Sequence, residues 1–258
     1  MQPGLIVTSR FTANIGRAAR EATEKRWRAS GLPGRPLTSL LERPEAQMAL
    51  DLEHLIALRL LEGTDLFVVQ IGAFDGRTGD QIHKWITRFG WHGILVEPQP
   101  RYFVELQRTY IDQSGLALRN VAVSERRETR TLYTLRDDVP GLPDWAPQVA
   151  SFDRAVVDGH GLRGPEGEEI VETYEVECLP LTDLLGGVDS IDLLQIDVEG
   201  YDAEIIRMFD FDTYRPCIVR FENRHLPRRD HDAAVRRLLD HGYRVALTGP
   251  DTIAWHGA

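Results

Sequence analysis

The sequence is short of cysteine and of long apolar runs, and each shortage excludes a class of protein. Cys178 and Cys217 are the only cysteines in 258 residues, and they form no C-x-x-C pair and have no histidines at metal-ligand spacing. We therefore expect a reducing, cytoplasmic location. No run approaches the roughly 18 apolar residues of a membrane span, and residues 1–16 lack the basic start and apolar core of a signal peptide. We expect neither membrane insertion nor export.

Acidic residues outnumber basic residues, 40 to 30. The formal net charge is −10 and the pI is near 5.3, which argues against a nucleic-acid or anionic membrane surface as the main partner. The basic stretch Arg17–Arg28 is interrupted by glutamates, so it is typical of a solvated face. Small molecules are the expected ligands, and homo-oligomerisation is left open.

The composition, with 42% apolar and 27% charged residues, favours one α/β domain that carries a terminal appendage. Residues 1–43 are polar and interrupted by glycine and proline, which predicts a loosely attached arm. From Pro44 to Gly63, apolar residues recur at three- and four-residue intervals and predict a helix. We divide the chain into residues 1–62, an arm and a helix, and residues 63–258, the main domain.

The main domain alternates short apolar runs with helical patterns. This rhythm is typical of parallel strands that are buried on both faces. An irregular stretch at 136–168, which contains Trp145, Phe152 and His160, is long enough to predict a substrate loop. The expected strands are 66–71, 93–97, 117–123, 129–135, 191–196 and 217–222, followed by a terminal hairpin at 243–248 and 252–255.

The first strand ends in the turn Gly72-Ala73-Phe74-Asp75-Gly76, and a helical pattern follows. Such a turn brings a ligand close to the backbone, although a turn of this kind is also used only to redirect a chain. Phe74 and Arg77 stand where a dinucleotide fingerprint requires glycine, which makes an NAD-dependent oxidoreductase a poor interpretation. Glu97 ends the second strand, where a carboxylate typically accepts hydrogen bonds from ribose hydroxyls. Together, the turn and Glu97 predict a nucleoside site.

Two acids follow the strand 191–196. Asp197 and Glu199 are two positions apart, so they share a face if the chain stays extended. Alternatively, Glu199 belongs to the first turn of the next helix, where Asp202 or Glu204 would serve equally well. Asp197, which is closer to the sheet, is the stronger candidate for a functional role.

The next strand ends in Glu222 and Asn223, and His225 follows. Asp197, Glu222 and Asn223 supply oxygen ligands that suit Mg²⁺ or Mn²⁺, and the same groups are equally able to bind substrate hydroxyls directly. His225 is a candidate general base, although lone histidines are more often structural. The other seven histidines show no ligand spacing, and we expect them on the surface.

Taken together, these blocks resemble the FkbM-type family of S-adenosylmethionine-dependent methyltransferases. The resemblance covers roughly residues 66–221. It rests on four ordered segments: 69–76 (VQIGAFDG), 96–98 (VEP), 120–124 (NVAVS) and 196–201 (IDVEGY). Two positions depart from the family pattern, because Phe74 stands where Asn is common and Gln195 where Lys is usual.

The resemblance implies an α/β fold with a seven-stranded, mostly parallel, Rossmann-like sheet and helices on both faces, here with an N-terminal helical extension. It also implies that S-adenosylmethionine is the cofactor. The implied contacts are Gly72, Ala73, Phe74, Asp75 and Gly76 near the methionine part, Glu97 on the ribose, and Asn120, Val121 and Ala122 near the adenine. Pro98 and Asp197 are further expected cofactor contacts.

We therefore expect methyl transfer to a hydroxyl that Asp197, Glu222 and Asn223 orient, directly or through a divalent ion, with His225 as a candidate base. The family resemblance implies acceptors such as sugars, polyketide hydroxyls, other natural products or glycans. The alternative is a nucleoside-binding or scaffold protein that kept the fold and lost the activity. The acids at 197 and 222 argue against this alternative.

Overall fold

The computed structural model describes residues 52–256 and divides the chain after Thr64 into two units. In the first unit the described element is α3 (Leu52–Glu62), in which Leu52, Leu55, Ile56 and Leu60 are buried. This confirms the carboxyl-terminal part of the helix predicted from Pro44 to Gly63. The predicted arm at 1–43 and the first residues of that helix lie outside the described residues.

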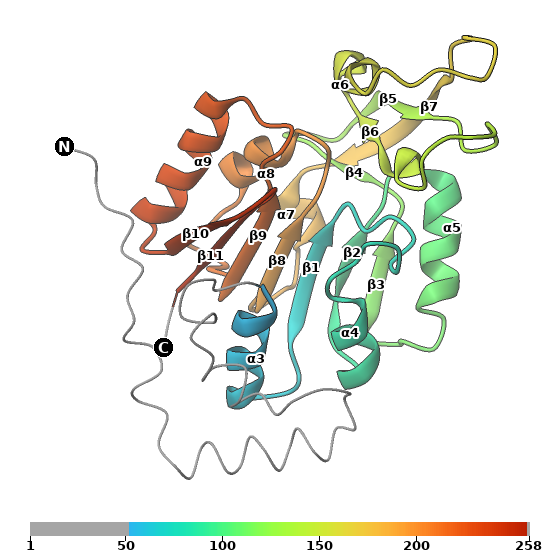
Figure 1. Ribbon diagram of the computed structural model, residues 1–258. Coiled ribbons are helices and arrows are strands. Elements are labelled where there is room, and N and C mark those ends of the chain that lie inside the picture. The colour runs from blue at the N-terminus through green and yellow to red at the C-terminus, as the bar shows by residue number, and fades with distance from the viewer. Residues whose placement is uncertain (1–51, 257–258) are drawn as a thin grey trace. The chain divides into compact units, whose positions relative to one another are not determined.

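The second unit is built on a seven-stranded sheet with the order β10-β11-β9-β8-β1-β2-β3 (Figure 1). The five neighbouring strands β9, β8, β1, β2 and β3 run parallel. β11 pairs antiparallel with β9, and β10 pairs antiparallel with β11. The strands are β1 (Phe67–Ile71), β2 (His92–Val96), β3 (Leu116–Arg119), β8 (Leu193–Ile196), β9 (Ile218–Glu222), β10 (Arg244–Thr248) and β11 (Asp251–Trp255). The predicted mostly parallel, seven-stranded α/β sheet is confirmed.

Four helices of this unit follow strands of the first sheet, as the apolar spacing predicts: α4 (His83–Phe89), α5 (Pro100–Thr109), α8 (Asp202–Met208) and α9 (Arg228–Asp240). The short helix α7 (Leu181–Leu184), which precedes β8, was not predicted. α5 contacts β3, α9 contacts β10, and α8 and α9 contact each other. Among the described residues, no helix has the length and apolar character needed to cross a membrane.

The order of the strands places a topological switch point between β1 and β8. From β1 the chain continues outward through β2 to β3, whereas β8 lies on the other side of β1 and leads outward to β9. In open parallel sheets, ligands bind beyond the carboxyl ends of the strands at this reversal. Gly72 and Asp197 directly follow the two strands that meet there.

A second sheet was not predicted. Its order is β4-β7-β5-β6, and it lies beyond the arrowheads of the central strands in Figure 1. Its strands are β4 (Ala122–Val123), β5 (Glu128–Leu135), β6 (Ala150–Ser151) and β7 (Val171–Leu179). The predicted single strand 117–123 was wrong, because it divides into β3 of the first sheet and β4 of the second. The predicted strand 129–135 is confirmed as β5.

The stretch 136–168 is more ordered than its irregular sequence predicts. It contains the short 3₁₀ helix η3 (Ala146–Gln148), β6 and α6 (Arg154–Gly159). A separate apolar cluster holds it against β5 and the start of β7. The buried members of this cluster are Leu135, Val139, Ala146, Val149, Val157 and Ile170.

The fully buried centre of the first sheet predicts which leucines matter for stability. Leu194 in β8 has no exposed surface, so we expect Leu194→Ala to lower the free energy of unfolding by about 2–5 kcal/mol. Leu239 in α9 is 49% exposed, and Leu239→Ala should change it by less than about 0.5 kcal/mol. Urea unfolding of both variants measures the difference, and equal losses would contradict the assigned core.

Candidate active site

A cleft with an empty volume of about 970 Å³ opens at the switch point. Residues from both sheets line it, because β6 and its neighbours close the side opposite β1 and β8. Phe152 and Tyr201 are among these closing residues. Of the predicted cofactor contacts, Gly72, Ala73, Phe74, Glu97, Pro98, Val121, Ala122 and Asp197 line the cleft.

At Gly72 the turn after β1 lies directly against the backbone of Asp197. Its φ is +84°, and a Cβ atom there would lie 1.8 Å from the backbone oxygen of Asp197. A side chain is therefore excluded both by conformation and by space. The amides of Gly72 and Ala73 donate hydrogen bonds to the backbone oxygen of Val96, which fixes the turn against β2.

Phe74 also has a left-handed backbone, with φ at +48°. Asn tolerates this conformation better than other non-glycine residues, which gives a physical reason for the Asn that the resemblance places there. Here, the Phe74 ring packs on Tyr102 with ring centroids 4.1 Å apart. An aromatic contact therefore stands where an Asn side chain would offer hydrogen-bonding groups.

Glu97 is buried beneath the turn. Its Oε2 accepts a hydrogen bond from the Phe74 amide, and its Oε1 accepts one from the Gln99 amide, both at 2.8 Å. Burial raises the pKa of Glu97 from 4.5 to about 7 despite these two donors. Each carboxylate oxygen keeps a further lone pair for a ligand hydroxyl.

Three predicted cofactor residues support the cleft without lining it. The Asp75 carboxylate accepts hydrogen bonds from the amides of Arg77 and Thr78 and so closes the turn on itself. A Cβ atom at Gly76 would lie 2.5 Å from the Tyr110 ring. The side-chain amide of Asn120 donates to the backbone oxygens of Glu97 and Pro98. Contacts of these three residues with a cofactor stay predictions.

Asp197 faces the cleft beside a buried arginine. Arg220 Nη1 lies 3.5 Å from Asp197 Oδ2, and Arg220 Nη2 lies 2.8 Å from Asp251 Oδ1. Burial raises the pKa of Asp197, and the guanidinium opposes this rise. One cation thus holds two carboxylates in place at the edge of the sheet.

Glu199 does not belong to a helix, because α8 begins at Asp202. Its backbone has a φ of +51° in the turn between β8 and α8, and Gly200 follows at +99°. The interpretation as a helix start was therefore wrong for Glu199. Asp202 takes the structural role instead, since its carboxylate accepts hydrogen bonds from the amides of Gly200 and Glu222.

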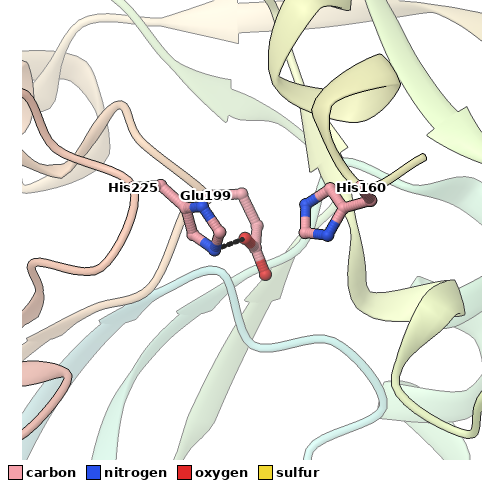
Figure 2. Close-up of side chains that lie close together, drawn as sticks. All are labelled: His160, Glu199 and His225. Atoms are coloured by element: carbon pink, nitrogen blue, oxygen red, sulfur yellow. Dashed lines mark ion pairs between the residues drawn. The ribbon is translucent and has the colours of Figure 1, made fainter.

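The turn brings Glu199 to the other acids and to His225. One oxygen each of Asp197, Glu199 and Glu222 lie within 4.8 Å of one another. His225 Nε2 lies 3.1 Å from Glu199 Oε2 (Figure 2). The same nitrogen lies 3.9 Å from Glu222 Oε2. Sequence reasoning placed Asp197, Glu222 and His225 near one another, but it left the role of Glu199 open.

Burial shifts the titration of these groups. It raises the pKa of Glu199 to about 8 and that of Glu222 to about 7, and repulsion between the carboxylates adds to both shifts. Burial also lowers the pKa of His225, and the neighbouring His160 adds to this effect. At neutral pH, the site therefore holds a neutral imidazole beside carboxyl groups that are close to their titration midpoints.

His160 follows α6 and reaches the same place, with its ring centroid 5.3 Å from that of His225. The expectation that the other seven histidines lie on the surface holds for His92, which is exposed, but it was wrong for His160, which is partly buried, as are the remaining five. Nothing in its spacing from the acids indicated this contact. The side-chain nitrogen of Asn223 donates to Thr252 Oγ1 at 3.0 Å, so its membership of a ligand set stays a prediction.

Comparison with known families agrees with this geometry. Residues 70–245 match the profile of the methyltransferase FkbM domain. The chain belongs to the FkbM methyltransferase family. Members of this family depend on S-adenosylmethionine, and the resemblance found in the sequence is confirmed. No curated protein sequence matches the chain significantly.

Several solved structures are similar in fold at low sequence identity. An FkbM methyltransferase from Methylobacillus flagellatus KT is 13% identical with a TM-score of 0.46; the match covers 75% of this chain and 44% of that one. This chain therefore spans less than half the length of that protein. A methyltransferase from Geobacter sulfurreducens is 14% identical with a TM-score of 0.38, and the match covers 91% and 95% of the two chains.

The Gly72 turn predicts a strict steric requirement. We expect Gly72→Ala to abolish measurable binding of S-adenosylhomocysteine, because the added methyl group meets the Asp197 backbone oxygen at 1.8 Å. Gly63→Ala is the matched control, since nothing lies within 4 Å of a Cβ atom there. Calorimetric titration of both variants measures the effect. Unchanged affinity in Gly72→Ala would contradict the close approach, and circular dichroism shows whether that variant is folded.

The raised pKa of Glu97 predicts a pH-dependent affinity. As pH falls through about 7, Glu97 takes up a proton. A protonated carboxyl group accepts hydrogen bonds from ribose hydroxyls less well than a carboxylate does. The affinity for S-adenosylhomocysteine should therefore fall below pH 7, by at most about tenfold per pH unit. Titrations from pH 5.5 to 8.5 measure this slope. Glu97→Gln should bind more weakly and lose that slope, and an equal slope in both proteins would assign it to another group.

Proposed function

We propose that this protein transfers a methyl group from S-adenosylmethionine to a hydroxyl oxygen of a small natural product, a sugar or a glycan. The observation that supports this most directly is the set of carboxylates Asp197, Glu199 and Glu222, whose oxygens lie within 4.8 Å of one another. Asp197 and Glu199 line the cleft itself. Carboxylates accept hydrogen bonds, so they orient hydroxyl groups and take up the protons these groups release.

The residues of the cleft fit the cofactor that the family uses. Gly72 lets the turn lie directly against the Asp197 backbone, where no side chain fits, and Glu97 offers buried carboxylate oxygens that would accept hydrogen bonds from ribose hydroxyls. Val121 and Ala122 give an apolar wall beside them, as suits an adenine ring. When bound, S-adenosylmethionine supplies an electrophilic methyl carbon attached to a positively charged sulfur.

In the proposed mechanism, Asp197 orients the acceptor hydroxyl and Arg220 holds Asp197 in position. The hydroxyl proton passes to Glu222, whose raised pKa makes it a good acceptor near neutral pH. Asp197 and Glu222 would thus leave the hydroxyl oxygen ready to take the methyl group that bound S-adenosylmethionine would supply, with the electron pair of the broken bond staying on its sulfur. In the metal-free enzyme, His225, neutral and within 3.9 Å of Glu222, is placed to take the proton onward.

The far wall of the cleft supports a polar acceptor with flat faces. Phe152 packs edge-on against Tyr201, with ring centroids 5.8 Å apart, and the Arg130 guanidinium lies 3.8 Å from the centre of the Phe152 ring. Ser151 and Gln148 add hydrogen-bonding groups to the same wall. Aromatic rings beside polar groups suit sugars, and these residues come from the stretch 136–168 and its neighbours, where we place acceptor selectivity.

A divalent ion on oxygen ligands is a second candidate for orienting the hydroxyl. Asp197, Glu222 and Asn223 are the ligands that we propose for Mg²⁺ or Mn²⁺. The carboxylate oxygens are close enough for this role, but Arg220 already supplies a positive charge 3.5 Å from Asp197. If the chelator-treated enzyme keeps full activity without added Mg²⁺, this candidate is excluded.

The proton acceptor can be tested by removing its charge. We expect Glu222→Gln to lower kcat by roughly 10²–10⁴-fold, with the affinity for S-adenosylhomocysteine unchanged, because Glu222 is not one of the predicted cofactor contacts. The measurement is methyl transfer to a panel of sugar, polyol, phenol and amine acceptors. Glu204→Gln is the control, since Glu204 pairs with Arg207 on the exposed side of α8.

Three outcomes of this panel contradict different parts of the proposal. Turnover of amines in preference to hydroxyl compounds would exclude O-methylation. Full activity in Glu222→Gln would remove that residue from the chemistry. Binding of S-adenosylhomocysteine together with no transfer to any acceptor would favour the non-catalytic, nucleoside-binding alternative.

A further inference from the structure

Two imidazoles and one carboxylate converge at the mouth of the cleft (Figure 2). His160 comes from the end of α6, Glu199 from the turn after β8, and His225 from the loop after β9. One potential ligand atom from each of the three lies within 4.8 Å of the others. In Figure 2 the Glu199 carboxylate lies between the two rings.

Polar atoms in this cluster lack hydrogen-bond partners among the residues that the structure describes. His160 Nε2 and Glu199 Oε2 are both buried without such a partner, and so is Glu222 Oε2 next to them. Glu199 Oε2 lies only 3.1 Å from His225 Nε2, yet the two atoms make no hydrogen bond. Buried polar atoms without partners destabilise a protein, and a bound ligand removes that cost.

The backbone holds Glu199 in this position. Its φ of +51° is unusual for a residue with a side chain, and conformations of this kind concentrate at functional sites. At Gly200 a Cβ atom would come within 3.6 Å of His225, so the turn and the loop that carries His225 are closely packed. Two of the three groups are therefore fixed relative to each other.

We propose that His160, Glu199 and His225 bind a divalent transition-metal ion of the Zn²⁺ type. Imidazole and carboxylate together suit zinc and its neighbours among the transition metals, whereas Mg²⁺ prefers ligand sets made of oxygen alone. Bonds of about 2.0–2.2 Å require the three side chains to close inward by small rotations. This site is distinct from the proposed oxygen-ligand site at Asp197, Glu222 and Asn223.

The proposed ion has a structural consequence that does not depend on the reaction. His160 belongs to the ordered stretch around α6, and the other two ligands belong to the edge of the main sheet. Binding therefore fixes the wall formed by α6 against the mouth of the cleft. Three protein ligands also leave a fourth position open for water or another ligand.

Binding of Co²⁺ tests the proposal without any methyl acceptor. The full-length protein, stripped with a chelator, is titrated with Co²⁺ and followed by visible absorption, and Zn²⁺ is then added in competition. We expect one ion per chain, displaced by Zn²⁺. His160→Ala, His225→Ala and Glu199→Gln should each weaken binding by at least about tenfold. His92→Ala is the matched control, since His92 is exposed at the start of β2, and it should bind as the unaltered protein does.

Two results would overturn the proposal. One is unchanged Co²⁺ affinity in both His160→Ala and His225→Ala. The other is loss of binding in Asp197→Asn with binding retained in the histidine variants, which would place the ion on the oxygen ligands. Circular dichroism of each variant shows whether it is folded, and His160→Gln serves as a milder change if His160→Ala is not. Because no acceptor is involved, failure of the proposed methyl transfer leaves this result interpretable.

Discussion

The structure depends on the close contact between the ends of β1 and β8. The Asp197 amide donates a hydrogen bond to the backbone oxygen of Ile71, and Gly72 lies against the Asp197 carbonyl with no room for a side chain. This contact brings the glycine turn and the acid-bearing turn together at the switch point of the sheet. Every functional group discussed above is placed relative to these two turns, so the cofactor side and the acceptor side share one rigid edge.

The same edge concentrates negative charge away from water. Burial is the first cause of the raised pKa values of Glu97, Glu199 and Glu222, and repulsion between acids adds to it. Arg220 neutralises part of this charge through its ion pairs with Asp197 and Asp251. A fold keeps such groups at a cost in stability, and ligands that donate hydrogen bonds or carry positive charge recover it. The cluster is therefore better explained by ligand binding than by packing.

Sequence reasoning located the parts of the site that depend on local pattern. Gly72, Glu97 and Asp197 each end a buried parallel strand, and the strand signal is a short apolar run that needs no tertiary information. The strand β7 was missed because glutamates interrupt its apolar residues, and 117–123 was read as one strand although Asn120 marks the change of sheet. Local pattern does not record which sheet a strand joins, since that is decided by long-range pairing.

The acceptor side of the site shows why its remaining residues could not be predicted from the sequence. Glu199 points into the site because its backbone adopts a left-handed conformation, which nothing in its own residue type favours. His160 arrives from α6, and α6 is positioned by the small apolar core around Val157 and Ile170. The residues proposed for the cofactor are thus positioned by contacts close to strand ends, whereas those proposed for the acceptor also depend on a second core. Substitutions in that second core should therefore alter acceptor binding while leaving the Gly72 turn intact, because the second core and the core of the main sheet share no buried residues.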